Sequence, residues 1–202
     1  MEWKSKFKDE CCADELEEMI VDYVKAGFWS NDKILMECEQ YIQDFYRSER
    51  ENIAKDDLLK IIQALRGEFS NTGSQENFRK LESAFRFLKE QGIVALHYAG
   101  YTQSDGFEDC NEVAAWLDEK GIKPVGCCFY TQQDLGHILH GESALLSISF
   151  GNYFENPTAE EVGKVIAGAL EAAGLCVQWD GSAAAKIAVK DFNWDKYYAD
   201  GE

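Results

Sequence analysis

Few groups of side chains in this sequence have both the types and the spacing that chemistry needs. The first is Cys128, Asp134, His137 and His140, in which the two histidines lie three residues apart on a predicted helix. Thiol, carboxylate and imidazole groups are all ligands that zinc takes in proteins. However, no CxxC pair accompanies them, and histidines on the surface or at a helix end are an equally simple reading. We expect no metal and no cofactor here.

The adjacent thiols of Cys127 and Cys128 form the second group, with redox or nucleophilic chemistry as the hypothesis. Neighbouring residues on a strand point to opposite faces, so at least one of the two is expected in the core. No basic residue adjoins them to lower a thiolate pKa. The sequence also lacks a GxSxG nucleophile elbow and a glycine-rich phosphate loop. Nothing in it requires an enzyme.

A third group of polar and aromatic residues follows the predicted strands, where such side chains can converge in a cleft. Each member also has a structural interpretation: the aromatic rings as core, one aspartate as a helix cap, and the other as part of a hairpin turn. The candidate binding residues are Tyr130, Gln133, Asp134, Phe150, Trp179, Asp180 and Trp194.

The elements that must position these residues change in type near residue 92. Before it, apolar residues recur every three or four positions, which predicts amphipathic helices at residues 12–27, 31–45, 58–66 and 78–90. Ser30 is a suitable N-cap for the second helix. Residues 1–91 are therefore expected to form a helical subdomain.

After residue 92, short apolar segments alternate with helical ones. Strands are predicted at 93–98, 125–130, 145–150, 175–179 and 185–189, and helices at 110–120, 132–139 and 158–173, with 101–109 as a loop. The last two strands are joined by a short turn and must be antiparallel. We therefore predict an α+β fold for 92–202: a two-layer sandwich with a mainly antiparallel sheet, preceded by the helical subdomain.

Charge limits the choice of partner. The 202 residues carry a formal charge of -17, and residues 93–202 hold 17 acidic and 6 basic side chains. A nucleic-acid surface needs clustered Lys and Arg, so nucleic acid is excluded and a basic protein is favoured. The alternative is that the carboxylates only confer solubility. With no membrane span, no signal peptide and seven cysteines, an odd number, we expect a cytoplasmic protein.

Several segments carry a resemblance to a known family: VDYVKAGFWSNDKI, FRFLKEQGIVA, FYTQQD, LSISFG, GLCVQWDG and the closing Trp194. Together they resemble a bacterial family of uncharacterised domains of unknown function. The resemblance implies a fold and no activity. It also implies no metal site, because the family is not expected to share His137 and His140.

Two functional hypotheses follow. The first is a non-enzymatic cytosolic interaction protein, in its sharpest form an immunity protein or inhibitor whose acidic surface covers a basic toxin or nuclease. The alternative is a small-molecule-binding or enzymatic domain that uses the cleft at the strand ends, with Asp134 or Asp180 as base and Tyr130 as an acid or as a group that orients the substrate. The lack of catalytic groups favours the first.

Overall fold

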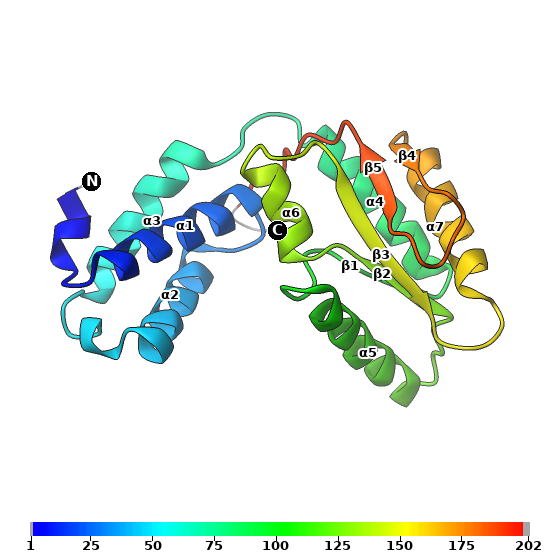
Figure 1. The fold of residues 1–202 in the computed structure, drawn as a ribbon, viewed down its shortest axis with the longest axis horizontal. Coiled ribbons are helices and arrows are strands. Elements are labelled where there is room, and N and C mark those ends of the chain that lie inside the picture. Colours follow the sequence, from blue (N-terminus) through cyan, green and yellow to red (C-terminus); the bar gives the residue numbers. More distant parts are fainter. Residues whose placement is uncertain (1, 200–202) are drawn as a thin grey trace. The chain divides into compact units, whose positions relative to one another are not determined.

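The computed structural model describes residues 2–199, which fold as two compact units (Figure 1). The first unit comprises Met1–Gln75 and Asp195–Glu202, and the second comprises Glu76–Trp194. The chain therefore passes from one unit to the other twice, and the described residues before Glu76 and after Trp194 belong to the first unit.

Helices make up the first unit. They are the 3-10 helix η1 (Glu2–Lys6), α1 (Glu10–Ala26), α2 (Asn31–Phe45), the 3-10 helix η2 (Arg47–Glu49) and α3 (Lys55–Phe69). Side chains of Asp9 and Ser30 accept backbone hydrogen bonds at the starts of α1 and α2. The core is formed by the apolar stripe of each helix, including Leu16, Ile34 and Ile62, which are fully buried.

The C-terminal segment completes this first unit. The Asn71 side-chain amide donates to the carbonyl oxygens of Lys25, at 3.1 Å, and Lys196, at 2.7 Å. The Gln75 side chain accepts a hydrogen bond of 3.1 Å from the backbone N–H of Tyr197. Gly27, at the end of α1, has a φ of 72°, and a Cβ there would lie 2.8 Å from the Lys196 carbonyl oxygen. A glycine is therefore needed where the end of α1 meets the segment around Lys196.

The second unit is built around a five-stranded sheet. In chain order its elements are α4 (Glu76–Glu90), β1 (Ile93–Leu96), α5 (Gln103–Glu119), β2 (Gly126–Phe129), α6 (Gln132–Leu139), β3 (Leu146–Asn152), α7 (Ala159–Ala172), β4 (Cys176–Gln178) and β5 (Ile187–Lys190). The strand order is β1-β2-β3-β5-β4. Only β1 and β2 are parallel, and the other three pairings are antiparallel.

Helices lie on both faces of this sheet (Figure 1). A Cβ at Gly126 of β2 would meet Val162 of α7, whereas a Cβ at Gly151 of β3 would meet the ring of Phe107 from α5. Gly151 pairs with Cys127, the neighbour of Gly126, so the two glycines face opposite sides. α4 packs beside α7, and α5 and α6 cover β1, β2 and β3 from the other side.

The predicted α+β class, the mostly antiparallel sheet, the helical N-terminal part and the closing β4–β5 hairpin are all confirmed. The structure also has a second helical layer, formed by α5 and α6, which the prediction did not include. None of the helices within residues 2–199 is both long and apolar enough to cross a lipid bilayer.

Several boundaries differ from those expected, and two of them change the architecture. The second unit begins at Glu76 rather than at residue 92, because α4 packs its apolar side on β1 and α7. Residues 103–109, predicted as a loop, are the first two turns of α5. The Thr102 side chain accepts from the Asp105 N–H, and the Asp105 side chain accepts from the Thr102 N–H, which starts the helix there.

Candidate functional site

Tyr130 and Trp194, two of the seven predicted binding residues, lie together in a buried aromatic cluster. Their ring centroids are 5.9 Å apart, and Phe78 of α4 meets Trp194 edge-on at 5.5 Å. Tyr130 is fully buried, and Trp194 is 5% exposed. These rings therefore act as core of the second unit, with the geometry that aromatic pairs prefer.

One polar contact lies within this cluster. His97 follows β1 and Tyr130 follows β2, and because these strands are parallel the two residues leave the sheet at the same end. The His97 Nδ1 lies 3.1 Å from the Tyr130 hydroxyl, and the imidazole stacks on Phe85 at 4.5 Å. Burial raises the pKa of Tyr130 well above its usual value. A phenol so held is suited to a structural hydrogen bond rather than to proton transfer at neutral pH.

Asp134 belongs to a second set of contacts, at the start of α6. Its carboxylate accepts from the Thr131 N–H at 3.1 Å and from the Thr131 hydroxyl at 2.8 Å, which completes a capping box. It also pairs with the Lys186 ammonium at 2.9 Å. The adjacent Gln133 is exposed. The carboxylate that we considered as a base is thus engaged in holding a helix end and an ion pair.

Phe150 and Trp179 form the third set. Their rings meet edge-on with centroids 5.5 Å apart, over Gly163 of α7. The Trp179 indole N–H donates to the carbonyl oxygens of Ser182, at 3.0 Å, and Ala185, at 3.2 Å. This ring therefore joins the β4–β5 connection to α7.

Asp180 lies in that same connection. Its carboxylate accepts a hydrogen bond of 2.8 Å from the Ser182 N–H, as aspartates do in turns. The seven predicted residues thus contact three different sets of neighbours. The structure brings Tyr130 to Trp194 and Phe150 to Trp179, and it commits both candidate carboxylates to local structure.

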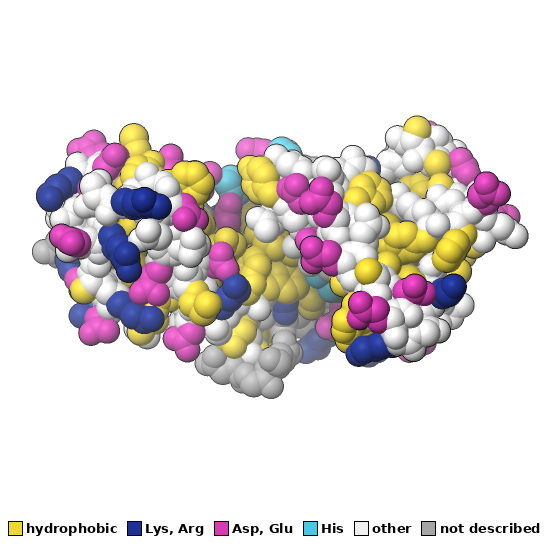
Figure 2. All heavy atoms as spheres, turned by 90° about the horizontal axis from the view of Figure 1, so that it is seen from below, with side chains coloured by type: hydrophobic (Ala, Val, Ile, Leu, Met, Phe, Trp, Pro, Cys, Tyr) yellow, Lys and Arg dark blue, Asp and Glu magenta, His cyan; other side chains and the backbone are white. Residues whose placement is uncertain are grey.

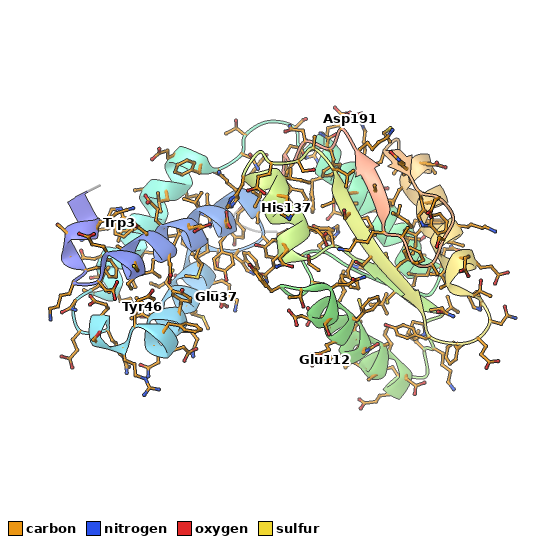
Figure 3. All side chains as sticks on the ribbon, in the orientation of Figure 1. Trp3, Glu37, Tyr46, Glu112, His137 and Asp191 are labelled. Carbon is orange, nitrogen blue, oxygen red and sulfur yellow. The ribbon has the colours of Figure 1, made fainter. Side chains whose placement is uncertain are left out.

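The histidines and cysteines of the metal hypothesis have separate surroundings. His137, labelled in Figure 3, is exposed and pairs with Glu142 at 2.7 Å, whereas Cys128 is fully buried. Burial raises the pKa of the Cys128 thiol, so the thiol form is favoured. Within residues 2–199, no three His, Cys, Asp or Glu side chains lie close enough together to hold a metal ion.

A buried pair of thiols was missed by the sequence reasoning. Cys110 of α5 packs with Cys127 of β2 in the core beneath α5, and the Tyr153 hydroxyl donates to the Cys110 carbonyl at 3.0 Å. The hydrogen bond with Cys127, together with burial, raises the pKa of the Cys110 thiol. The only signal for this pairing was that Cys110 falls on the apolar side of a predicted helix.

The second unit also carries an apolar groove that the sequence did not indicate. It has a volume of about 360 Å³ and runs along the outer edge of β1. Gly92 and the strand β1 line it, together with Val113 and Leu117 of α5, with Ile122 and Pro124, and with Lys89 of α4, its one charged lining residue. Ile122 is 52% exposed.

The helix beside this groove is strongly acidic. α5 carries six carboxylates and no basic residue. Asp105 is used in the capping box, and Glu108, Glu112, Asp118 and Glu119 are exposed. Figure 3 shows Glu112 on this helix, and in the right half of Figure 2 hydrophobic side chains gather with acidic side chains around them.

The comparisons with known proteins give a family and no activity. A family model described as "Domain of unknown function (DUF6891)" matches residues 9–198. No curated protein and no solved structure matches the chain. The match covers both units, so the geometry described above must carry any argument about function.

Proposed function

This chain belongs to the DUF6891 family of domains of unknown function, and because that membership names no activity, we propose from its surface that it is an acidic cytoplasmic protein that binds a basic partner protein. The sharpest form of the proposal is an immunity protein or inhibitor whose partner is a basic toxin or nuclease. The seven cysteines are all free, in keeping with a reducing compartment.

One observation carries the proposal: the acidic helix α5 borders an exposed apolar groove. Protein interfaces combine an apolar centre with a polar rim, and complementary charges on that rim guide association. Here the groove offers the apolar centre, and the neighbouring helix α5 offers six carboxylates, although Lys89 also lines the groove. The formal charge of -17 extends the same preference over longer distances.

The alternative, a small molecule bound or converted in a cleft at the strand ends, has less support. Its two candidate bases are Asp134, which caps α6 and pairs with Lys186, and Asp180, which holds a turn. Its candidate acid, Tyr130, is fully buried. A cleft mechanism would have to release these groups from their present contacts.

The test begins with the full chain immobilised and exposed to lysate of its native organism at low salt. We expect a basic protein to be retained and to elute along a salt gradient, because salt screens charge pairs at a surface. That protein is then purified, and its affinity is measured directly as a function of salt concentration.

Matched variants show whether the carboxylates of α5 are responsible for binding the basic partner. Glu108→Gln, Asp109→Gln and Glu112→Gln together remove three charges from α5, and Glu10→Gln, Glu18→Gln and Glu68→Gln remove three from exposed positions of the first unit. The α5 variant should bind about tenfold more weakly, since each surface charge pair is worth up to about 1 kcal/mol. The control should bind like the parent chain. Retention of no basic protein at low salt, or equal loss in both variants, would contradict the proposal.

A further inference from the structure

We propose that the groove along β1 binds a small amphipathic anion, a carboxylate on a linear apolar chain, with the carboxylate beside Lys89 and the chain against α5. This inference goes beyond the proposed function, since it assigns a small-molecule ligand to the groove itself. A protein that covers the groove would compete with that ligand. Small-molecule sites are typically lined by apolar side chains, with a few polar or charged groups that fix the orientation of the ligand.

The lining of the groove is apolar apart from its single lysine. Residues 93–95 of β1 are at most 4% exposed, so a ligand meets mainly the partly buried side chains of Val113 and Leu117 and the exposed side chain of Ile122. The volume of about 360 Å³ lies at the lower end of the roughly 300–1,000 Å³ of ligand pockets. The groove therefore suits a small apolar body.

Lys89 supplies the charge in this lining. Its side chain is exposed in the last turn of α4, and within residues 2–199 it forms no ion pair. Among the described residues no Asp or Glu lines the groove, although the chain has 37 acidic side chains. An anionic group beside Lys89 would form a charge pair that the chain itself does not provide, whereas a basic group would be repelled.

Two more lysines lie toward the same end of the groove. The Val125 N–H donates to the Gly92 carbonyl at 2.8 Å, so the segment before β2 lies beside the start of β1, next to the end of α4. Lys123 lies between two lining residues of that segment, and Lys120, at the end of α5, has its ammonium 3.3 Å from the Trp116 ring centroid. Charges farther away than about 8 Å are largely screened at physiological salt. These lysines therefore offset part of the formal charge of -17 at this end of the groove.

The lining toward the opposite end of the groove carries no charged residue among those described. α5 follows β1 in the chain and runs back along it, so Leu117 lies toward the start of the strand and Val113 lies one turn farther along. Asp118 and Glu119 directly follow Leu117, and successive helix residues point in different directions, so these carboxylates lie off the Val113–Leu117 side. The five lining residues from 92 to 96 extend roughly 13 Å from first to last. A linear chain that starts at Lys89 can follow them toward Val113.

The experiment titrates the full chain with octanoate, octanol and octylamine, which share one apolar chain and differ in the charge of the head group. Isothermal titration calorimetry measures the affinities at concentrations below those at which these compounds form micelles. Octanoate should bind about fivefold more tightly than octanol, which is the effect of one exposed charge pair, and octylamine should bind most weakly. Hexanoate should bind about tenfold more weakly than octanoate, because it buries two methylene groups fewer.

Matched variants separate the groove from a second hollow, of about 430 Å³, which lies between α4 and α7 and is lined in part by Lys164 and Val165. Lys89→Gln should weaken octanoate binding about fivefold and leave octanol binding unchanged. Ile122→Ser should weaken the binding of both about tenfold, because the groove then loses a branched apolar contact. Lys164→Gln and Val165→Ser make the same two changes in the second hollow and should leave the binding of both compounds unchanged.

NMR spectra of the backbone amides locate the bound compound. Shifts at Gly92 and Ile122 on addition of octanoate, reduced in Lys89→Gln, support the proposal. Equal affinity for octanoate and octylamine overturns it, as does an octanoate affinity that is the same in Lys89→Gln and Ile122→Ser as in the parent chain. Shifts centred on Gly168 in the second hollow, or no binding of octanoate at millimolar concentration, also overturn it.

Discussion

Gly163 occupies a position on α7 where a side chain has no room. A Cβ there would lie 2.6 Å from the Trp179 ring and 2.9 Å from the Phe150 ring. These two rings meet edge-on and hold α7 against the β4–β5 end of the sheet. Close packing of this kind leaves no space for one more methyl group without moving a ring or the helix.

Gly163→Ala should therefore destabilise the protein by about 1–3 kcal/mol, the usual cost of overpacking a core. Gly168→Ala, on the same helix, is the matched control, because a Cβ at that position has no atom within 4 Å. The control should be stabilising by about 0.5–1 kcal/mol, since alanine favours a helix over glycine. Urea unfolding of the three proteins measures both effects, and destabilisation in both variants would contradict the packing argument.

For the candidate binding residues, the sequence indicates positions along the strands but not the residues that they contact. Trp179 and Asp180 directly follow β4, whereas Phe150 lies within β3, and each residue adopts the structural alternative that its type allows. The pairing of Phe150 with Trp179 could not be predicted, because it depends on β5 lying between β3 and β4. Likewise, the groove exists only because β1 is an outer strand, and strand order is not written in any local pattern.

Three helices of the second unit begin with the same device. α5, α6 and α7 each start with a threonine N-cap and an acidic residue three positions later, and all three capping boxes are complete. The helix predicted at 158–173 begins at the threonine of one of these boxes. The box at Thr102 lies in residues 101–109, which are predicted as a loop. Gly106 is needed there since a Cβ would lie 2.2 Å from the Phe129 ring.

Asp105 gives the capping box of α5 a testable pH dependence. Hydrogen bonds with Thr102 lower the pKa of Asp105 below the ordinary value of 3.8, and the bond from the Thr102 backbone N–H has the largest effect. The pKa of Asp105 is thus lower in the folded state than in the unfolded state. The ionised carboxylate therefore stabilises the fold above pH 3.8, and this stabilisation is lost as the pH falls through the folded-state pKa.

Asp105→Asn should accordingly lower the melting temperature at neutral pH, and the difference from the parent chain should shrink as the pH falls below 3.8. Asp118→Asn removes the same charge from an exposed position at the other end of α5 and should have little effect. Calorimetry across this pH range measures both. A difference between Asp105→Asn and the parent that stays constant with pH would show that the carboxylate does not stabilise the cap.

The whole chain is organised so that the second unit is inserted within the first. The first unit needs residues from both ends of the chain, and Asn71 joins them through its hydrogen bonds to the carbonyls of Lys25 and Lys196. No local pattern in the sequence shows that a segment after residue 194 returns to the N-terminal helices. That is why the sequence analysis assigned the entire C-terminal half to the sheet.

Asn71→Ala should destabilise the first unit by about 1–3 kcal/mol, because it leaves two carbonyl groups without their donor. Thr72→Ala, at the exposed neighbouring position, is the control and should be near neutral. Hydrogen exchange read separately for peptides of each unit measures the effect. Exchange should become faster in α1 and α3 and stay unchanged in β2 and β3, and equal acceleration in both units would contradict the division of the chain.

The return of the C-terminal segment to the first unit also sets an order of folding during synthesis. Domains generally fold from the N-terminus onward as the ribosome releases them. Here Lys196 and Tyr197, which bind Asn71 and Gln75, are translated after every strand of the sheet. All strands of the sheet are therefore made before the helices α1 to α3 receive their contacts from Lys196 and Tyr197, although these helices precede the sheet in the chain.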